Sequence, residues 1–221
     1  MPTTCRPSSS ASGKTTMSEA LAERWSPWGR EYARTPDRFI WGTGPSSLAR
    51  DVARRLGPRA RVLDLGCGEG RDSVFLAERG HSVVGLELSI DGLRKAARLA
   101  ADRGVRVTWV CAALPAVPLS GPFDLVFSCG SIHYVASADR PRLFQELGAL
   151  TRPGGYHAHA VFTARRVYRE KGEVVHYFTP RELGDAYRDW DVLRHEEGLI
   201  RCAQDGVRHT HSVETLLARR R

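Results

Sequence analysis

The sequence lacks the features that mark secreted, membrane-spanning and zinc-ribbon proteins. Its five cysteines are odd in number and form no Cys-X-X-Cys pair, which argues against a disulfide framework and a zinc ribbon, so we expect no metal site. No run of about 18 apolar residues occurs, and the N-terminus has no apolar signal segment, so we expect neither a membrane span nor export. A cytoplasmic location is the simplest interpretation.

Lysine is also scarce, because Lys14, Lys95 and Lys171 are the only three lysines among 33 basic residues. Nearly all of the formal net charge of +8 therefore comes from arginines that are spread along the chain. A nucleic-acid-binding protein instead gathers its basic residues on one face or carries a recognisable binding module. We therefore expect no nucleic-acid partner and no membrane partner.

The length and composition suit one α/β domain. The chain has 221 residues, of which 42% are hydrophobic and 26% are charged, as in an ordinary globular protein. Residues 1–20 are rich in Ser, Thr, Pro and Ala without periodicity, which predicts a disordered tail. We expect residues 21–221 to form a single domain, with an aromatic-rich cap at 21–44 and the core at 45–221. A packing arm laid across the sheet is the alternative to a cap.

The chain is organised around one stretch, Val62-Leu63-Asp64-Leu65-Gly66-Cys67-Gly68-Glu69-Gly70. The apolar residues at its start predict a strand buried in a parallel sheet, and a helix-like segment follows at 71–79. Glycines at alternate positions between them predict a strand-to-helix turn whose backbone comes close to a ligand. In an open α/β sheet, the carboxyl end of such a strand is where a nucleoside cofactor binds.

A carboxylate, Glu87, ends the next apolar run, seventeen positions after Gly70. At that distance a carboxylate can accept hydrogen bonds from the hydroxyls of a ribose. The glycine pattern is G-X-G-X-G, in contrast to the G-X-G-X-X-G of dinucleotide folds, and it is accompanied by Asp64 and Glu69. Because carboxylates disfavour a pyrophosphate, we predict a cationic ligand without phosphate.

Strand-like and helix-like segments alternate along the rest of the chain, which predicts a Rossmann-like, doubly wound α/β fold. We expect a seven-stranded, mostly parallel sheet that ends in an antiparallel edge hairpin, with a turn at residues 153–155. The predicted strands are residues 62–65, 83–87, 105–111, 123–128, 156–162, 190–193 and 213–217. The predicted helices are residues 45–56, 71–79, 89–103 and 140–150, and a capping box with proline at the first helical position begins another at 179–182.

The glycine stretch, Glu87, the strand Phe123-Asp124-Leu125-Val126 and the segment Arg152-Pro153-Gly154-Gly155 resemble class I S-adenosylmethionine (SAM) methyltransferases. The segments 68–73 and 178–183 are similar, more narrowly, to the tellurite-resistance (TehB-like) methyltransferases. The resemblance implies SAM as the cofactor and a transferase that methylates a small molecule. The cofactor-binding residues that it implies are Asp64, Gly66, Cys67, Gly68, Arg71, Asp72, Glu87, Leu88, Ala113, Leu114 and Ser128.

Ala113 stands where many of these methyltransferases carry an acid that holds the adenine amine, so the turn and Glu87 are expected to contribute more of the recognition. For the acceptor side, the candidate catalytic residues are His133 and Tyr134, which follow the fourth strand, and His176. A histidine titrates near neutrality, so it can deprotonate or orient a nucleophile; a structural role is the alternative for His133. The residues expected to contact the acceptor are Trp28, Trp41 and Arg165.

The resemblance to the TehB-like family favours a thiol or a selenium or tellurium species as the acceptor. The nearest alternative is an N- or O-methyltransferase that tailors a secondary metabolite. A non-catalytic SAM-binding protein is a further alternative. Methylation of nucleic acid is disfavoured, because Ser128-Cys129-Gly130-Ser131 stands in place of the Asn/Asp-Pro-Pro-Tyr/Phe motif of base amine methylation. We expect a monomer or a homodimer.

Overall fold

The structure, a computed structural model, describes residues 27–168, 174–203 and 206–221. The predicted disordered tail (1–20) and the first part of the predicted cap (21–26) lie outside the described residues. Among the described helices, none combines the length and the apolar character that a membrane span requires. The elements are α2 (Pro27–Arg34), α3 (Ser47–Ala53), β1 (Arg61–Leu65), α4 (Arg71–Glu78), β2 (Ser82–Glu87), α5 (Ile90–Asp102), β3 (Thr108–Cys111), β4 (Phe123–Cys129), the 3₁₀ turn η1 (Ile132–Tyr134), α6 (Arg140–Leu150), β5 (Thr151–Phe162), α7 (Glu182–Ala186), β6 (Asp191–Cys202) and β7 (His209–Arg219).

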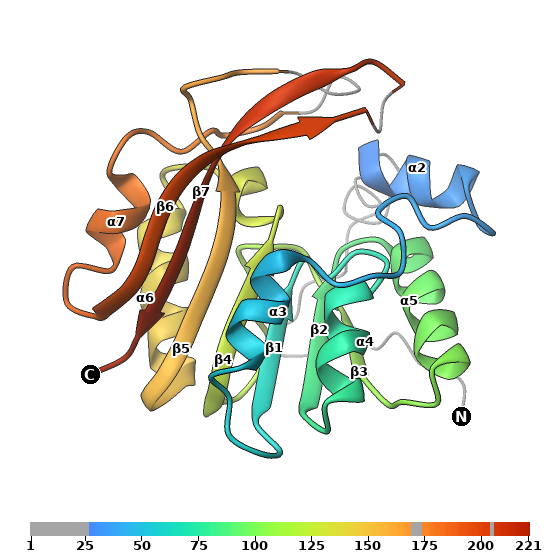
Figure 1. Ribbon diagram of the computed structural model, residues 1–221, viewed down its shortest axis with the longest axis horizontal. Helices are drawn as coiled ribbons and strands as arrows, with labels where there is room; N and C mark the ends of the chain where they lie inside the picture. The colour runs from blue at the N-terminus through green and yellow to red at the C-terminus, as the bar shows by residue number, and fades with distance from the viewer. Residues whose placement is uncertain (1–26, 169–173, 204–205) are drawn as a thin grey trace, which may run out of the picture.

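The described strands form one sheet in the order β3-β2-β1-β4-β5-β7-β6 (Figure 1). The pairs from β3 to β5 are parallel, whereas β7 pairs antiparallel with both β5 and β6. The strand order reverses between β1 and β4, and ligands of open α/β sheets bind at the carboxyl ends of the strands beside such a reversal. The predicted doubly wound, seven-stranded fold with an antiparallel edge hairpin is confirmed.

Alternate residues of β1 pack against helices on opposite faces of the sheet. Val62 lies in a buried cluster with Leu48 and Val52 of α3. Leu63 lies in a second buried cluster with Leu143 of α6. Because side chains alternate along a strand, a continuously apolar strand needs cover on both faces. The apolar run at the start of the glycine stretch has this cover, and it fixes where the turn begins.

The edge hairpin is much longer than the sequence predicts. Strands expected at 190–193 and 213–217 extend over the whole of β6 and β7. Most residues of β6 are exposed, and many carry charged side chains, so the strand lacks the apolar alternation that reveals a strand in a sequence. Its backbone is held by a ladder to β7 that runs from Asp191 opposite Arg219 to Cys202 opposite His209. Cross-strand pairing sets these boundaries.

The turn predicted at 153–155 is wrong, because these residues lie inside β5, which begins at Thr151. Gly154 has a φ of +76°, and the pairing with β4 shifts register here. The Gly154 N–H donates to the Arg220 carbonyl at 2.9 Å. This bond to a residue near the C-terminus satisfies the N–H at the point where the register shifts.

Two other boundaries differ for local reasons. β3 begins at Thr108, three residues later than predicted, because the Val105 N–H donates to a carbonyl at the end of α5. The predicted capping box is present, since the Thr179 N–H donates to the Glu182 carboxylate at 2.9 Å. Pro180, however, stands in the turn before α7 and does not occupy its first position. The remaining predicted elements end within three residues of their observed bounds.

Candidate active site

A cleft of about 850 Å³ opens at the carboxyl ends of β1, β2 and β4. Small-molecule sites typically measure roughly 300–1,000 Å³, so the cleft has the size of a cofactor site with room for a small second ligand. Most of the site residues that the sequence predicts line it. They are Trp28, Trp41, Asp64, Gly66, Cys67, Gly68, Arg71, Asp72, Glu87, Leu88, Ala113, Leu114, His133 and Tyr134.

The turn after β1 is held in a conformation that requires glycine. Gly66 has a φ of +64°, and a Cβ at this position would lie 2.3 Å from the Cβ of Ser131. The Ser131 hydroxyl donates to the Leu65 carbonyl at 2.6 Å, which fixes the neighbour that fills this space. The Cys67 N–H donates to the Leu86 carbonyl at 3.0 Å and ties the turn to β2. At Gly66 the turn therefore presents backbone atoms to the cleft, with no side chain between them and a ligand.

Glu87 ends β2, and both of its carboxylate oxygens accept backbone hydrogen bonds. One accepts from the Gly68 N–H at 3.0 Å and the other from the Ser89 N–H at 2.8 Å. The carboxylate thus joins the glycine turn to the start of α5. An ionised carboxylate offers about four acceptor positions, so Glu87 can still accept from two hydroxyls of a ligand.

Glu69 corrects our interpretation of the glycine pattern. Its side chain is buried, forms an ion pair with Lys95, and accepts the backbone N–H groups of Ile40 at 3.0 Å and Trp41 at 3.1 Å. Its charge is therefore compensated inside the protein, where it holds the segment after α2 against the turn. The expectation of a cationic ligand rests on the other carboxylates of the cleft.

Two of those carboxylates, Asp64 and Asp72, lie behind the turn. The Ser73 hydroxyl donates to Asp64 at 2.5 Å, and the Ser46 N–H donates to Asp72 at 2.6 Å. Burial, with a smaller contribution from the charge of Asp72, raises the pKa of Asp64 to about 7. Burial also raises the pKa of Asp72, against the opposing effect of Arg71. A cation bound beside Asp64 would favour its ionised form.

The raised pKa of Asp64 predicts that this carboxyl makes the stability of the ligand-free protein depend on pH. In the unfolded chain it ionises near its usual pKa of 3.8, whereas in the folded protein it keeps its proton up to about pH 7. Between these values the folded state binds more protons, so the stabilising contribution is complete below the unfolded pKa and is lost as the pH rises to about 7. The free energy of unfolding in urea should therefore depend less on pH in Asp64→Asn than in wild type, and at about pH 8 it should be higher in Asp64→Asn than in wild type.

The exposed Asp102→Asn is the control and should show the pH dependence of wild type. If the free energy of unfolding of Asp64→Asn changes with pH in parallel with that of wild type, the prediction is contradicted.

Aromatic side chains of α2 and the segment after it lie over the cleft. The Trp28 indole N–H donates to the Tyr134 hydroxyl at 2.7 Å, and the ring centroids of Trp28 and Trp41 are 5.2 Å apart. Arg71 donates to the Trp41 carbonyl at 3.1 Å. Figure 1 shows α2 beyond the carboxyl ends of the parallel strands. These contacts join the described part of the predicted cap to both sides of the cleft.

His133 is buried in the wall of the cleft, and one backbone hydrogen bond decides its tautomer. Its Nδ1 accepts from the Phe162 N–H at 3.1 Å, so Nδ1 carries no proton. In the neutral imidazole the proton then resides on Nε2. The rings of His133 and Phe162 stack with their centroids 4.2 Å apart. His133 is therefore arranged to donate a hydrogen bond and is poorly placed to accept a proton.

Ser128 is not brought to the cleft. Its side chain is buried on the other face of the sheet, where its hydroxyl forms a hydrogen bond of 2.9 Å with Nδ1 of His159. Side chains alternate along β4, so the next residue, Cys129, lines the cleft instead. A displacement of one position along a strand moves a side chain to the opposite face.

Arg165 and His176 also lie outside the lining of the cleft. Arg165 is exposed and forms an ion pair with Glu197 of β6 at 3.2 Å. The backbone N–H of His176 donates to the His133 carbonyl at 2.9 Å. His176 thus supports the position of His133 through its backbone.

Tyr32 and Ser131 also line the cleft, and neither is among the site residues predicted from the sequence. A Cβ at Gly68 would lie 2.8 Å from the Tyr32 hydroxyl oxygen, so Tyr32 closes over the turn. Burial raises the pKa of Tyr32 well above its usual value, which keeps the phenol neutral. Tyr32 follows Trp28 by four positions, one helical turn, and this spacing was an available signal. Nothing in the local sequence reveals the role of Ser131.

Residues 62–155 match a family described as a methyltransferase domain. The chain is similar to the tRNA 5-carboxymethoxyuridine methyltransferase of Escherichia coli (strain K12), with 36% identity over 143 residues, which are 56% of this chain and 54% of that protein. The chain spans about half the length of the first curated relatives that it matches.

The fold is similar to that of TehB from Haemophilus influenzae, with a TM-score of 0.73 and 21% identity over 81% of this chain and 64% of that chain. It is also similar to the 1,6-didemethyltoxoflavin-N1-methyltransferase of Burkholderia thailandensis, a structure with bound S-adenosylhomocysteine, with a TM-score of 0.66 and 23% identity over 96% of this chain and 93% of that chain. The matched residues contain the glycine turn and Glu87. Residues 62–155 therefore form a methyltransferase domain, the fold of the chain is TehB-like, and the likeness to structures with bound S-adenosylhomocysteine indicates SAM as the cofactor.

Proposed function

We propose that the protein transfers a methyl group from SAM to a small, soft nucleophile that enters as an anion, with a thiolate or a selenium or tellurium species as the favoured acceptor. One observation carries the proposal: Nδ1 of His133, a residue that lines the cleft, accepts from the Phe162 N–H, so a neutral ring keeps its proton on Nε2 and has no lone pair left to act as a base. An amine or an alcohol loses a proton on methylation and benefits from a base, whereas an anionic acceptor benefits from a donor that positions it.

The residues of the cleft fit the cofactor by their chemistry. When bound, SAM supplies an electrophilic methyl group on a sulfonium. We assign Glu87 to the ribose hydroxyls, since its carboxylate is fixed at the end of β2. Asp64 is assigned to the cationic methionine end, and Leu88 and Leu114 to the apolar walls around the adenine. The chain's own contribution is to hold the two reactants in line and to exclude water.

The size of the cleft supports a small acceptor. The cofactor and the acceptor share about 850 Å³, and the hydrogen-bonded side chains of Trp28 and Tyr134 line part of this space. We propose that the enzyme acts in the cytoplasm, as a monomer or a homodimer, and without nucleic acid.

An acceptor screen that follows the release of S-adenosylhomocysteine tests the proposal. Selenite, tellurite and simple thiols are compared with heteroaromatic amines, phenols and bulk tRNA at equal concentrations. Turnover confined to the soft anions supports the proposal. Turnover confined to amines, phenols or tRNA would overturn the acceptor class, and SAM binding without turnover for any acceptor would indicate a non-catalytic protein.

A second acceptor class is favoured by the aromatic wall of the cleft. Trp28 and Trp41 both line the cleft, with their ring centroids 5.2 Å apart. Such rings stack well on a flat heteroaromatic molecule. An N- or O-methyltransferase that tailors a secondary metabolite is therefore the alternative, and the amine and phenol arms of the screen detect it.

Glu87→Gln should weaken SAM binding about 10- to 30-fold without unfolding the protein. The amide oxygen keeps one backbone hydrogen bond, but the charge that strengthens the bonds from the ribose is lost, and a hydrogen bond to a charged group contributes roughly 1.5–3 kcal/mol. Isothermal titration calorimetry measures the change. The surface variant Glu78→Gln is the control; equal affinities for both variants would remove Glu87 from the cofactor site.

His133→Asn should lower kcat/KM for the acceptor about fivefold and leave the shape of the pH–rate profile unchanged. Asparagine keeps an acceptor for the Phe162 N–H but offers no donor at the position of Nε2, and one net hydrogen bond contributes about 1 kcal/mol. His133→Gln, which restores an N–H donor further out, is the matched control and should recover part of the rate. Loss of a titration from the profile in His133→Asn would instead assign a general base to this residue.

A further inference from the structure

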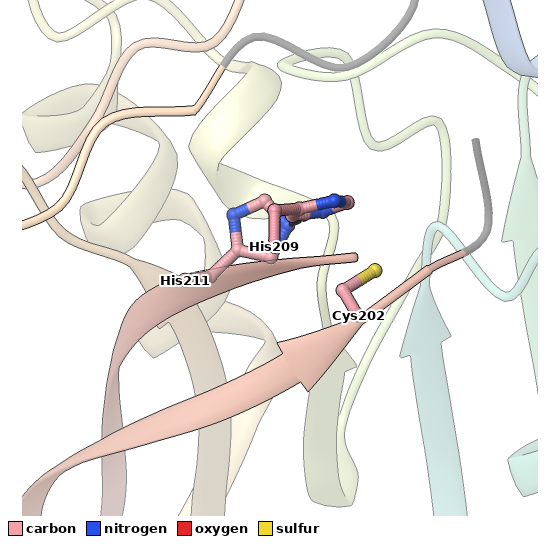
Figure 2. Close-up of side chains that lie close together, drawn as sticks. All are labelled: Cys202, His209 and His211. Atoms are coloured by element: carbon pink, nitrogen blue, oxygen red, sulfur yellow. Dashed lines mark hydrogen bonds between the residues drawn. The ribbon is translucent and has the colours of Figure 1, made fainter. Parts of the chain in front are cut away.

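The tip of the β6–β7 hairpin gathers one cysteine and two histidines. Cys202 ends β6 and stands directly opposite His209, the first residue of β7, and His211 follows two positions later. Directly opposed residues, and residues two apart on one strand, project from the same face of a sheet. The register therefore places all three side chains on one side of the hairpin, and Figure 2 shows them clustered there. Their ligand atoms all lie within 4.8 Å of one another.

We propose that Cys202, His209 and His211 bind a divalent cation of borderline softness, Zn²⁺ in the first place, with a fourth position for water or another small ligand. One thiolate and two imidazoles are a ligand set that suits tetrahedral Zn²⁺. Zinc holds sulfur at about 2.3 Å and nitrogen at about 2.0–2.1 Å, so ligand atoms around one ion lie roughly 3.3–3.6 Å apart. The upper limit of 4.8 Å exceeds these spacings by roughly 1.2–1.5 Å, so the side chains need only small shifts to close on an ion.

Hydrogen bonds already orient His209 as a ligand. Its Nδ1 donates to the Val207 carbonyl at 2.7 Å, so in the neutral ring the lone pair is on Nε2. This Nε2 lies 2.9 Å from Nε2 of His211, which donates to it. A cation between the two nitrogens takes the place of that proton, the proton of His211 moves to its Nδ1 or to solvent, and the thiol proton of Cys202 is released to solvent as the thiolate binds. Metal-bound histidines commonly donate their other ring nitrogen to a carbonyl, as His209 does here.

Packing holds the cluster in place. The Cys202 and His211 side chains are buried, and His209 is half-buried. The His209 ring stacks on Tyr168 with centroids 3.8 Å apart, and the His211 ring stacks on Phe162 at 4.1 Å. Rings that are stacked on neighbours have little freedom to lose when they coordinate a metal, which favours binding.

The cluster adjoins the cleft, although its three residues do not line it. Phe162 lies between His211 and His133, with ring centroids at 4.1 and 4.2 Å. Ile200, which stands opposite His211, lines the cleft. A bound ion would therefore tie β6 to β7 behind the acceptor side of the cleft. The site does not depend on the identity of the acceptor.

Cobalt titration of the full-length, tag-free chain in reducing buffer tests the site. We expect one Co²⁺ per chain, with the visible absorption of tetrahedral cobalt and a near-ultraviolet thiolate-to-cobalt band, both removed by one equivalent of Zn²⁺. Cys202→Ser should lose the thiolate band. His209→Asn and His211→Asn should each weaken cobalt binding at least about 100-fold. Loss of a residue that only supports a metal ligand costs up to about 100-fold, so this is the threshold for a direct ligand. Cys111→Ser, on a different strand, is the matched control and should behave as wild type. A thiolate band that persists in Cys202→Ser and disappears in Cys111→Ser would overturn the proposal.

A second measurement uses the wild-type protein alone, so it does not depend on the folding of any variant. Histidine ring resonances are followed by NMR while Zn²⁺ is added. Two imidazoles, assigned to His209 and His211 by their mutual contacts, should shift in step with one equivalent of metal. Shifts of other histidines only, or no shift at all, would show that the hairpin does not bind the ion.

Discussion

Gly66→Val is expected to weaken SAM binding at least about 100-fold, the equivalent of roughly 3 kcal/mol. The φ of Gly66 is +64°, a region that a β-branched residue enters only under strain, and its Cβ would lie 2.3 Å from the Cβ of Ser131. Ser131 cannot withdraw without breaking its hydrogen bond to the Leu65 carbonyl. The turn itself must therefore move, and it carries the N–H of Gly68, which Glu87 holds. Calorimetry with SAM measures the loss.

Gly80→Val is the control that distinguishes the effect of backbone strain from the effect of a steric clash with Ser131. Gly80 has a φ of +82°, and no atom lies within 4 Å of where its Cβ would be, so the substitution strains the backbone away from the cleft. We expect Gly80→Val to lower stability and to keep the wild-type affinity for SAM. A second comparison removes the clash itself. The double variant Gly66→Ala/Ser131→Gly should bind SAM better than Gly66→Ala, because it lacks the Ser131 side chain that the new Cβ would meet. Equal affinities for Gly66→Val and Gly80→Val would show that the turn does not shape the cofactor site.

The cofactor half of the site is predictable from the sequence because its signals are local. The apolar run before Asp64, the glycines after it and the carboxylate that ends the next run all report the conformation of their own segment. Parallel strands then bring their carboxyl ends to one edge, so Glu87 and the turn meet without further information. The structure places both where the pattern indicates, joined by the hydrogen bond from the Gly68 N–H.

The parts that could not be predicted depend on pairing between distant segments. The sequence gives no sign that the Glu69 carboxylate is paired, because Glu69 lies in the glycine turn and its partner Lys95 lies on α5. A single lysine on the otherwise apolar face of α5 was the available signal. The proposed metal ligands Cys202, His209 and His211 form no recognisable spacing, since only the register of the hairpin brings them together. The sequence does not show which way the Ser128 side chain faces, because a shift of one position along a strand reverses the face, and its hydroxyl is hydrogen-bonded to His159.

Lys95→Met should lower the free energy of unfolding by about 3–5 kcal/mol, the usual cost of removing one partner of a buried ion pair. The Lys95 and Glu69 side chains are 4% and 1% exposed, so the remaining carboxylate would stay buried without a counter-charge. Lys95 also donates to the Arg38 carbonyl at 2.7 Å, and that bond ties the segment after α2 to α5. We therefore expect a melting temperature lower by roughly 6–20 °C for a domain of this size.

A double-substitution cycle with Glu69→Gln tests whether the unpaired buried charge of Glu69 causes the loss of stability in Lys95→Met. Glu69→Gln/Lys95→Met removes both charges, and its amide oxygen still accepts from one of the Ile40 and Trp41 N–H groups, so it should be more stable than Lys95→Met alone. The matched control is Arg94→Met, on the same helix, whose ion pair with Asp91 is largely exposed and contributes about 0–1 kcal/mol. If Lys95→Met costs no more than Arg94→Met, the ion pair does not hold the cap, and Glu69 would regain a role toward the ligand. If it costs more and the double variant recovers stability, then the carboxylate among the glycines serves the fold, and the cleft recognises its cofactor through Asp64 and Glu87.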